Sequence, residues 1–485
     1  MRTSRPIALL FGVLFAVGAC ASSSTTPAPA TQPAASQPAA SQPAASQPAS
    51  QAAASLSAPV ALTLWEHQKP RCDVLTKVLP DFEAAEKAAG KDVTVNLVCD
   101  VIEDEAFRQK VTLAYQGDTP PDVTSYPGAW VPDFSTAGYL LDITDRLNAW
   151  PDWAAHFYQV LRDRAQQADG KYYSMPRHGT VIELFLRKDV LDQNGISTEQ
   201  PNSWDELITR LKDLHAKTGL PAITIPAGKT WGGGTFDEGF IHIFNGTGGT
   251  LYDAATGKWV VKSQALKDAF NFYNTLQTDG LLPTKALLDP QPWQPTKYDG
   301  FTGTTADGKA IPVAPPITTQ GSWGWVYDWG PAPTGARPIP DLLNKVTTWA
   351  FPSKAAGQDF VWAAEDWMWT ISQKSQHPEE AFDLLKFLNT GAPLAADVAA
   401  VGNLAPRDDI QSIAPYSDMP YLIDMEKLLP TGKSFKAQVG IDKIQQAVGD
   451  ATEQILLGKK NGDEAADYFA SQATDLLGPD AVESQ

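Results

Sequence analysis

Two pairs of neighbouring carboxylates are the residues in this sequence best suited to catalysis. Asp237-Glu238 and Glu365-Asp366 could each supply the two acids that a glycosidase places around a glycosidic bond. Adjacent acids are, however, far more often solvated or hydrogen-bonded groups than a catalytic pair. These two pairs alone therefore do not predict an enzyme.

The motifs of other common enzyme classes are incomplete in this sequence. Residues 303–309 have the spacing of a phosphate-binding loop, but Ala310 stands where Ser or Thr must bind Mg²⁺. No two of the six histidines lie four residues apart, so the sequence has no zinc-protease helix. It has no Gly-x-Ser-x-Gly elbow either. We therefore expect no catalytic residues, no metal site and no cofactor.

Alternating strands and an amphipathic helix at the start of the folded part predict an α/β architecture. Residues 61–65 and 93–97 alternate as strands, with a helix over residues 73–89 between them and a third strand over residues 122–124. Such a unit implies parallel strands, whose ligands bind beyond their carboxyl ends. This rule selects the side chains that follow the first and third strands: Trp65, Glu66, His67, Gln68, Tyr126 and Trp130.

The stretch 282–352 breaks these regular patterns. Pro, Gly, Thr and Trp dominate it, so we expect a long irregular region. Five of the chain's 15 tryptophans lie within it: Trp293, Trp323, Trp325, Trp329 and Trp349. Long ordered loops rich in aromatic residues are more often binding surface than filler.

Length and charge limit the class of protein further. The part from about residue 59 onward is too long for one small core and suits two domains. The formal net charge of -18 disfavours nucleic acid and anionic lipid surfaces as partners.

The N-terminus has the pattern of an export signal followed by a tether. Arg2 and Arg5 precede an apolar run, and Gly18-Ala19 precede Cys20. This context resembles the lipobox of bacterial lipoproteins, apart from Val17 where Leu is commoner. Residues 20–58 are mostly Ala, Ser, Gln, Pro and Thr and include a Pro-Ala-Ala-Ser-Gln repeat, which predicts a disordered linker. We expect a signal peptide over residues 1–19, lipidation of Cys20, and a folded part outside the cytoplasm, anchored to the cell membrane.

The two remaining cysteines form an even pair in an oxidising compartment. Cys72 follows the first predicted strand and Cys99 ends the neighbouring one, so the two strand ends can meet. The sequence predicts a disulfide between them. Two free buried thiols are the alternative.

Seven stretches occur in an order that resembles one known family. They include Leu62-Thr63-Leu64-Trp65, the stretch from Gly138 to Thr144, the stretch from Asp169 to Pro176, Pro201-Asn202-Ser203-Trp204-Asp205-Glu206, Gly321-Ser322-Trp323, and Gly402-Asn403-Leu404-Ala405-Pro406-Arg407. From residue 61 to about residue 477 the chain resembles the solute-binding proteins of ABC importers, in the extracellular family 1 of maltose and multiple-sugar binders. The residues around Asp366-Trp367 depart from the double Gly often found there.

The resemblance implies an α/β fold of the type II periplasmic-binding-protein kind, with two lobes joined by crossing hinge strands. Lobe 1 would hold residues 59–180 and 364–417, and lobe 2 residues 181–363 and 418–485. The lobes would close on a ligand and deliver it to the permease subunits of an ABC transporter in the membrane. We expect a monomer.

The family also implies a carbohydrate ligand. Pyranose rings have apolar faces and a rim of hydroxyls, so a site needs flat aromatic side chains and polar ones. The family's Gly-x-Trp loop would place Trp323 over the sugar. The candidate ligand-binding residues are Trp65, Glu66, Gln68, Tyr126, Trp130, Arg177, Glu183, Trp231, Trp323, Asp366, Trp367 and Arg407. Two alternatives stay open: the same fold with a non-sugar solute such as a polyamine or peptide, and a secreted glycan-acting enzyme.

Overall fold

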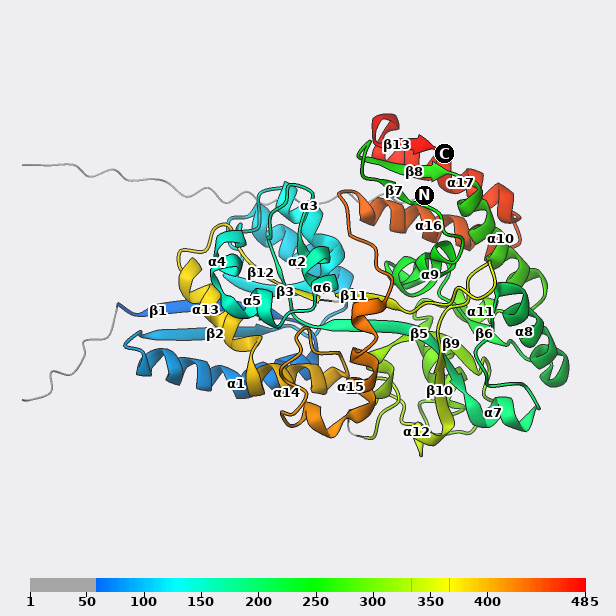
Figure 1. Cartoon of the computed structure of the whole chain (residues 1–485), viewed down its shortest axis with the longest axis horizontal. Coiled ribbons are helices and arrows are strands. Elements are labelled where there is room, and N and C mark those ends of the chain that lie inside the picture. Colours follow the sequence, from blue (N-terminus) through cyan, green and yellow to red (C-terminus); the bar gives the residue numbers. More distant parts are fainter. Residues whose placement is uncertain (1–57, 333, 366) are drawn as a thin grey trace, which may run out of the picture. The chain divides into compact units, whose positions relative to one another are not determined.

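The computed structural model describes residues 58–332, 334–365 and 367–485 (Figure 1). The predicted signal peptide, Cys20 and the linker apart from Ala58 lie outside the described residues, as does Asp366.

The first sheet carries the predicted strand-helix-strand unit. Its strand order is β2-β1-β3-β12-β4. β1 pairs in parallel with both β2 and β3, and β12 is antiparallel to β3 and β4. The bounds are β1 Val60–Glu66, β2 Val93–Cys99, β3 Val123–Pro127, β4 Met175–Pro176 and β12 Trp367–Ile371. The parallel α/β arrangement predicted here is confirmed.

Helices cover this sheet and lead into the second part of the fold. α1 begins at Lys69, earlier than predicted, because Pro70 suits the first turn of a helix. Their bounds are α1 Lys69–Ala88, α2 Asp104–Gln116, η1 Gly128–Trp130, α3 Val131–Thr136, α4 Thr144–Ala149, α5 Pro151–Ala155, α6 Gln159–Ala165, α13 Pro378–Leu388, α14 Gly391–Val401 and η6 Tyr416–Asp418. α15 Pro420–Glu426 follows and packs against the second sheet. Over the described ranges, no single helix is both long and apolar enough to cross a membrane. α13 and α14 together have the length and composition, but the chain bends by 66° between them.

The second sheet has the order β10-β5-β9-β6, and β11 also pairs with β5. A smaller sheet follows the order β13-β8-β7. The bounds are β5 Gly179–Arg187, β6 Ile223–Thr224, β7 Tyr252–Asp253, β8 Lys258–Lys262, β9 Ile317–Gly321, β10 Val346–Trp349, β11 Trp362–Glu365 and β13 Val482–Ser484.

Long helices pack on the second sheet. Ser203 caps α8 by accepting a hydrogen bond from the backbone N–H of Glu206, and Gly219 ends this helix in the left-handed conformation. The bounds are α7 Lys188–Gln193, α8 Trp204–Thr218, η2 Lys229–Trp231, η3 Thr235–Phe240, α9 Ile241–Asn245, α10 Gln264–Thr278, α11 Thr284–Leu287, η4 Gln294–Gly300, η5 Ser322–Trp325, α12 Leu342–Lys345, η7 Leu429–Thr431, α16 Ile441–Leu456, α17 Gly462–Leu477 and η8 Pro479–Ala481.

The prediction for residues 282–352 is wrong in part. This stretch contains β9 and β10, two strands of the second sheet. Trp325, Trp329 and Trp349 are buried, with Trp329 at 0 % exposure. Every residue of β9 is buried, so the strand shows no polar alternation that its sequence could reveal. Much of the Trp-rich region is therefore core rather than binding surface.

The chain crosses between the two main sheets more than once. It passes from the first to the second between β4 and β5, and returns between β11 and β12. We call the elements around the first sheet lobe 1 and those around the second sheet lobe 2. α16 and α17 belong to lobe 2, because their buried side chains join its main hydrophobic core. The crossing strands agree with the predicted two-lobed fold.

Candidate functional site

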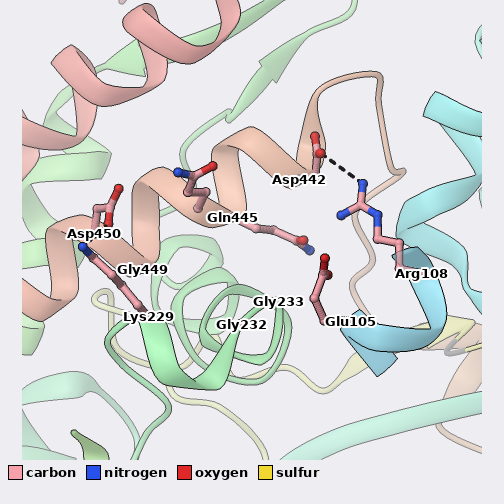
Figure 2. A pocket seen from close by; sticks show the side chains of 10 residues that line it. Glu105, Arg108, Lys229, Gly232, Gly233, Asp442, Gln445, Gly449 and Asp450 are labelled. Atoms are coloured by element: carbon pink, nitrogen blue, oxygen red, sulfur yellow. Dashed lines mark hydrogen bonds and ion pairs between the residues drawn. The ribbon is translucent and has the colours of Figure 1, made fainter. Parts of the chain in front are cut away.

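A cavity of about 460 Å³ lies between α2 of lobe 1 and α16 of lobe 2 (Figure 2). We call it the α2–α16 cavity. Its volume falls within the range of about 300–1,000 Å³ that is usual for small-molecule sites. It is lined by Glu105, Arg108, Lys229, Gly232, Gly233, Asp442, Gln445, Gln446, Gly449 and Asp450.

His67 positions the lobe 1 wall of the cavity. Its ring lies at the end of β1, stacks on Phe107 at 4.0 Å and contacts Asp104 Oδ1 through Nε2 at 2.8 Å. Asp104 lies in the first turn of α2, where an acid also suits the helix dipole. Glu105 and Arg108 follow on this helix, so the buried His67 fixes the part of α2 that lines the cavity.

A glycine-rich loop and α16 form the lobe 2 wall. Gly232 has a φ of 55° and a ψ of -134°, a conformation that essentially only glycine adopts, and a Cβ there would meet open space. A Cβ on Gly233 would lie 3.3 Å from Gln445 Oε1, so the backbone of the loop approaches this side chain closely. Gln445 in turn donates to Asp237 Oδ2 at 2.9 Å. The loop after Trp231 therefore packs directly on α16.

Most charged groups in the cavity already have partners. Arg108 contacts Asp442 at 3.0 Å, and Lys229 contacts Asp450 at 2.9 Å (Figure 2). The lining also offers the amides of Gln445 and Gln446, and contains no Ser, Cys or His. This wall can donate and accept hydrogen bonds, but it holds no nucleophile paired with a base.

A buried polar cluster supports Trp231 beside the cavity. Two π-helical turns meet here, because Glu238 on η3 forms an ion pair with Lys297 on η4. Lys297 is 4 % exposed, also donates to Gln320 Oε1 at 2.8 Å, and its Nζ lies 5.3 Å from the centre of the Trp231 ring. π-helical turns are rare and frequent at functional sites. Sequence reasoning missed Lys297, which has no recognisable motif.

The cluster continues to a buried carboxylate. Asp328 accepts a hydrogen bond from Tyr298 at 3.1 Å and another from Gln320. Burial raises the pKa of Asp328 to about 6, although the nearby Lys297 opposes the rise.

Both carboxylates of the pair Asp237-Glu238 are thus engaged, with Gln445 and Lys297 respectively. These two adjacent acids are therefore hydrogen-bonded groups, which is the more common case that the sequence analysis favours.

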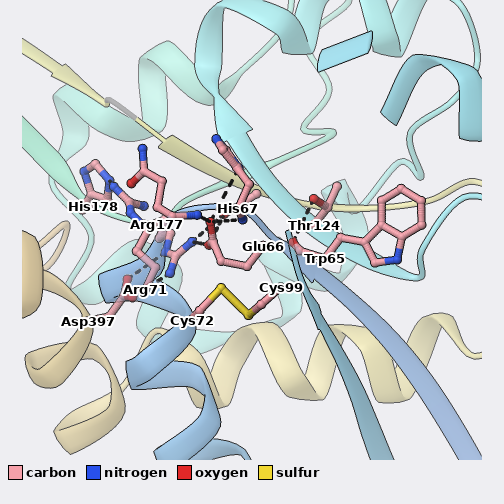
Figure 3. A network of polar contacts seen from close by, with 12 residues as sticks. Trp65, Glu66, His67, Arg71, Cys72, Cys99, Thr124, Arg177, His178 and Asp397 are labelled. Carbon is pink, nitrogen blue, oxygen red and sulfur yellow. Dashed lines mark hydrogen bonds and ion pairs between the residues drawn. A yellow bond between two sulfur atoms is a disulfide. The ribbon is translucent and has the colours of Figure 1, made fainter. Parts of the chain in front are cut away.

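A second network joins two predicted site residues inside lobe 1 (Figure 3). Arg177 pairs with Glu66 and binds Asp397 through two hydrogen bonds of 2.7 and 2.6 Å. Burial alone would raise the pKa of Glu66, but Arg177 and Arg71 hold it below its ordinary value. Glu66 and Arg177 are both fully buried, so they anchor the crossing between β4 and β5 instead of facing a ligand.

Three predicted aromatic residues are core. Tyr126 and Trp130 are buried and stack at 5.4 Å. Trp367 is 3 % exposed, stacks on His67 at 5.0 Å and lies under the Arg71 guanidinium at 4.5 Å. Trp130 contacts Arg108, which lines the cavity. The Arg108 guanidinium lies 5.6 Å from the centre of the Trp130 ring.

Two further predicted polar residues are also buried. Arg407 is 2 % exposed, and its guanidinium is taken by Asp152, Asp409 and the Asn389 carbonyl. Glu183 lies in β5 at 5 % exposure, and burial raises its pKa to about 7. The sequence shows that such residues are polar, but it does not show that they are buried or already bound by other side chains.

Four predicted residues keep part of their side chains exposed. Trp65 points away from the Glu66 network (Figure 3), with Lys110 Nζ 3.9 Å from the ring centre. Gln68 precedes α1. Trp231 borders the cavity through Gly232, and Trp323 packs partly against the lobe 2 core. The Trp323 ring folds over Gly321 so closely that a Cβ there would clash, which accounts for glycine in the Gly-x-Trp loop.

Cys72 and Cys99 form the predicted disulfide, with a Cα–Cα distance of 6.0 Å (Figure 3). It ties the start of α1 to the end of β2, beside the Glu66 network.

In the described part of the chain, one group of side chains could hold a metal ion: His156, Asp408 and Asp409. His156 Nδ1 lies 3.0 Å from Asp408, while Asp409 is bound by Arg407. The group is partly exposed and none of its residues lines the α2–α16 cavity, so we assign no metal to it.

Comparison with known proteins identifies the family. Residues 74–392, well over half of the chain, match the family described as bacterial extracellular solute-binding protein. The chain belongs to this family. As an extracellular solute-binding protein, it has its place outside the cytoplasm.

Individual members agree with this. The multiple sugar-binding protein of Streptococcus mutans is 22% identical over 75% of this chain and 81% of its own. The cyclic alpha-maltosyl-1,6-maltose binding protein of Arthrobacter globiformis has a TM-score of 0.68 at 18% identity, over 87% of this chain and 99% of its own. The GacH receptor of Streptomyces glaucescens has a TM-score of 0.66 at 19% identity, over 87% of this chain and 100% of its own. These structures establish the two-lobed α/β fold that the sequence predicts.

Proposed function

We propose that this solute-binding protein captures a neutral carbohydrate between its two lobes and delivers it to the permease of an ABC importer. The observation that carries the proposal is the α2–α16 cavity, which is polar, lies between the lobes and is lined by Gly232, the residue after Trp231. The similarity to a multiple sugar-binding protein supports a sugar as the ligand.

Charge pairing in the cavity supports a neutral ligand over a polyamine. A polyamine needs carboxylates that are free to pair with its ammonium groups. Of the three acids that line the cavity, Asp442 and Asp450 already bind Arg108 and Lys229. Hydroxyl groups, by contrast, suit the amides of Gln445 and Gln446.

We propose Trp231 and Trp323 as the aromatic plates for the sugar, with Gln445, Gln446 and Glu105 on its hydroxyl rim. Partial exposure of both indoles supports this role. The predicted lobes, residues 59–180 with 364–417 and residues 181–363 with 418–485, would close around the ligand as a hinge. No chemical step is part of this function.

We further propose that Cys20 carries a lipid and that the repeat-rich linker lets a monomer reach the permease. The small residues before Cys20 and the Ala/Ser/Gln/Pro composition after it support this anchoring.

A thermal-shift screen tests the proposed ligand class. Ligand at 100 times Kd raises the free energy of unfolding by about 2.7 kcal/mol. We expect such a rise with one or more neutral oligosaccharides and none with spermidine or spermine. A rise with polyamines alone would contradict the proposal.

A further inference from the structure

Three residues from lobe 1 and two from lobe 2 meet at the edge of the α2–α16 cavity. Arg108 Nη2 on α2 contacts Asp442 Oδ2 in the first turn of α16 at 3.0 Å. Asp133 Oδ1 on α3 accepts a hydrogen bond from the backbone N–H of Gly440 at 3.2 Å. Arg108 also lies over the buried ring of Trp130. Direct contacts thus link the two lobes beside the space proposed for the ligand.

Arg108 pairs with one carboxylate, that of Asp442, and its charge also acts on a second, that of Asp133. Burial and the neighbouring Asp442 raise the pKa of Asp133, while Arg108 lowers it. Two acids from opposite lobes therefore lie beside each other, and the positive charge of Arg108 offsets their repulsion. The side chains of Arg108 and Asp442 are 23% and 30% exposed, so water screens their attraction only in part.

We infer that Arg108 is a positioning residue that holds the lobes together through its ion pair with Asp442, beside the Asp133–Gly440 hydrogen bond, and thereby sets how fast the protein opens to release its ligand. The inference rests on the proposed function for its release step. Trp130 orients the Arg108 guanidinium. This buried indole thus has a role although it does not contact the ligand.

The ion pair between Arg108 and Asp442 predicts how single and double substitutions change the rate of ligand release. Arg108→Gln removes the cation and leaves two carboxylates facing each other, so release should be about tenfold faster, or about 1.4 kcal/mol. Asp442→Asn leaves Arg108 beside Asp133 and should speed release about threefold. The double variant should release more slowly than Arg108→Gln alone, because the second substitution removes the repulsion.

Neutral substitutions are preferred to a charge swap. Asp442 lies in the first turn of the 16-residue α16, where a cation would oppose the helix dipole for reasons unrelated to Arg108. Lys443→Gln is the matched control, since it neutralises the exposed neighbouring residue on the same helix. It should leave both release and closure as in the parent protein.

The experiment uses the full chain with one fluorophore on an exposed site of each lobe. Interlobe distance is measured without ligand, at low and high salt, and release rates are measured for the oligosaccharide that gives the largest thermal shift. We expect a smaller closed fraction in Arg108→Gln, partial recovery in the double variant, and a salt-sensitive closed fraction in the parent.

Two outcomes would overturn the inference. One is that neither single substitution changes the unliganded distances. The other is that the two effects multiply, to about thirtyfold faster release in the double variant. If no oligosaccharide binds any of the proteins, the proposed function fails, but the unliganded distances still decide the role of Arg108.

Discussion

The pKa of Glu183 allows a quantitative test of its burial in β5, the strand that follows the first crossing between the sheets. The residue is 5 % exposed, and burial raises the pKa of its carboxyl from 4.5 to about 7, although a hydrogen bond from Thr348 opposes the rise. A buried acid with a raised pKa keeps in the folded state a proton that the unfolded state releases. The free energy of unfolding should therefore fall as the pH rises from 4.5 through about 7.

The size of this fall follows from the two pKa values. At about 1.4 kcal/mol for each pKa unit, the change from 4.5 to about 7 corresponds to about 3 kcal/mol. Glu183→Gln keeps the shape of the side chain without an ionisable proton. The variant should match the parent at pH 4.5 and be more stable than the parent above pH 7, by up to about 3 kcal/mol.

Denaturant unfolding of parent and variant across pH 4.5 to 8 measures this difference. Comparing the two proteins cancels other groups, such as Asp328, whose pKa is also raised. Glu199→Gln, at an exposed position, is the control and should follow the parent at every pH. Parallel curves for the parent and Glu183→Gln would show that Glu183 does not retain its proton in the folded protein.

Three further substitutions test separate parts of the account. Trp323→Ala should weaken sugar binding about 10–70-fold, because an indole face of about 60–100 Å² is lost. If calorimetric titration instead gives unchanged affinity, and the melting temperature of the unliganded protein is lowered, Trp323 belongs to the core. Cys72→Ser should lower the free energy of unfolding by about 3–4 kcal/mol in denaturant titration, because the disulfide closes a loop of 27 residues and so restricts the unfolded chain. Equal stability with and without the disulfide would argue against this restriction of the unfolded chain. Cys20→Ser should move the protein from the membrane to the soluble fraction of producing cells, and retention in the membrane fraction would disprove lipidation at this position.

Local patterns were sufficient for the regular elements of the fold. The alternation in β1 and β2, and the cap of α8 by Ser203, are decided by residues within a few positions of each other. The disulfide also follows from nearby features, because Cys72 lies in the first turns of α1, just after β1, and Cys99 ends the parallel neighbour β2.

The site depends on contacts that sequence spacing does not reveal. Arg108 and Asp442 are 334 residues apart, and Gln445 and Gln446 on α16 look like the ordinary polar face of a helix. Only the folded chain brings α2 and α16 to the same cavity.

Burial of paired charges explains the site residues that sequence reasoning misplaced. Glu66 follows a strand end as predicted, but Arg177, 111 residues away, occupies its oxygens. Arg407 is likewise occupied by acids near in space. A sequence identifies residues that could bind a ligand, whereas the fold decides which of them already have partners.

Calorimetric titration of a variant with a blocked cavity measures whether the carbohydrate binds between α2 and α16. Gln446 is exposed and lines the α2–α16 cavity, so Gln446→Trp should fill it without disturbing the core, while Lys443→Trp adds the same side chain outside the lining. The parent and Lys443→Trp should bind the best oligosaccharide of the screen with equal affinity, and Gln446→Trp at least about tenfold more weakly, or about 1.4 kcal/mol. Equal affinity of Gln446→Trp and the parent would contradict a carbohydrate site between α2 and α16.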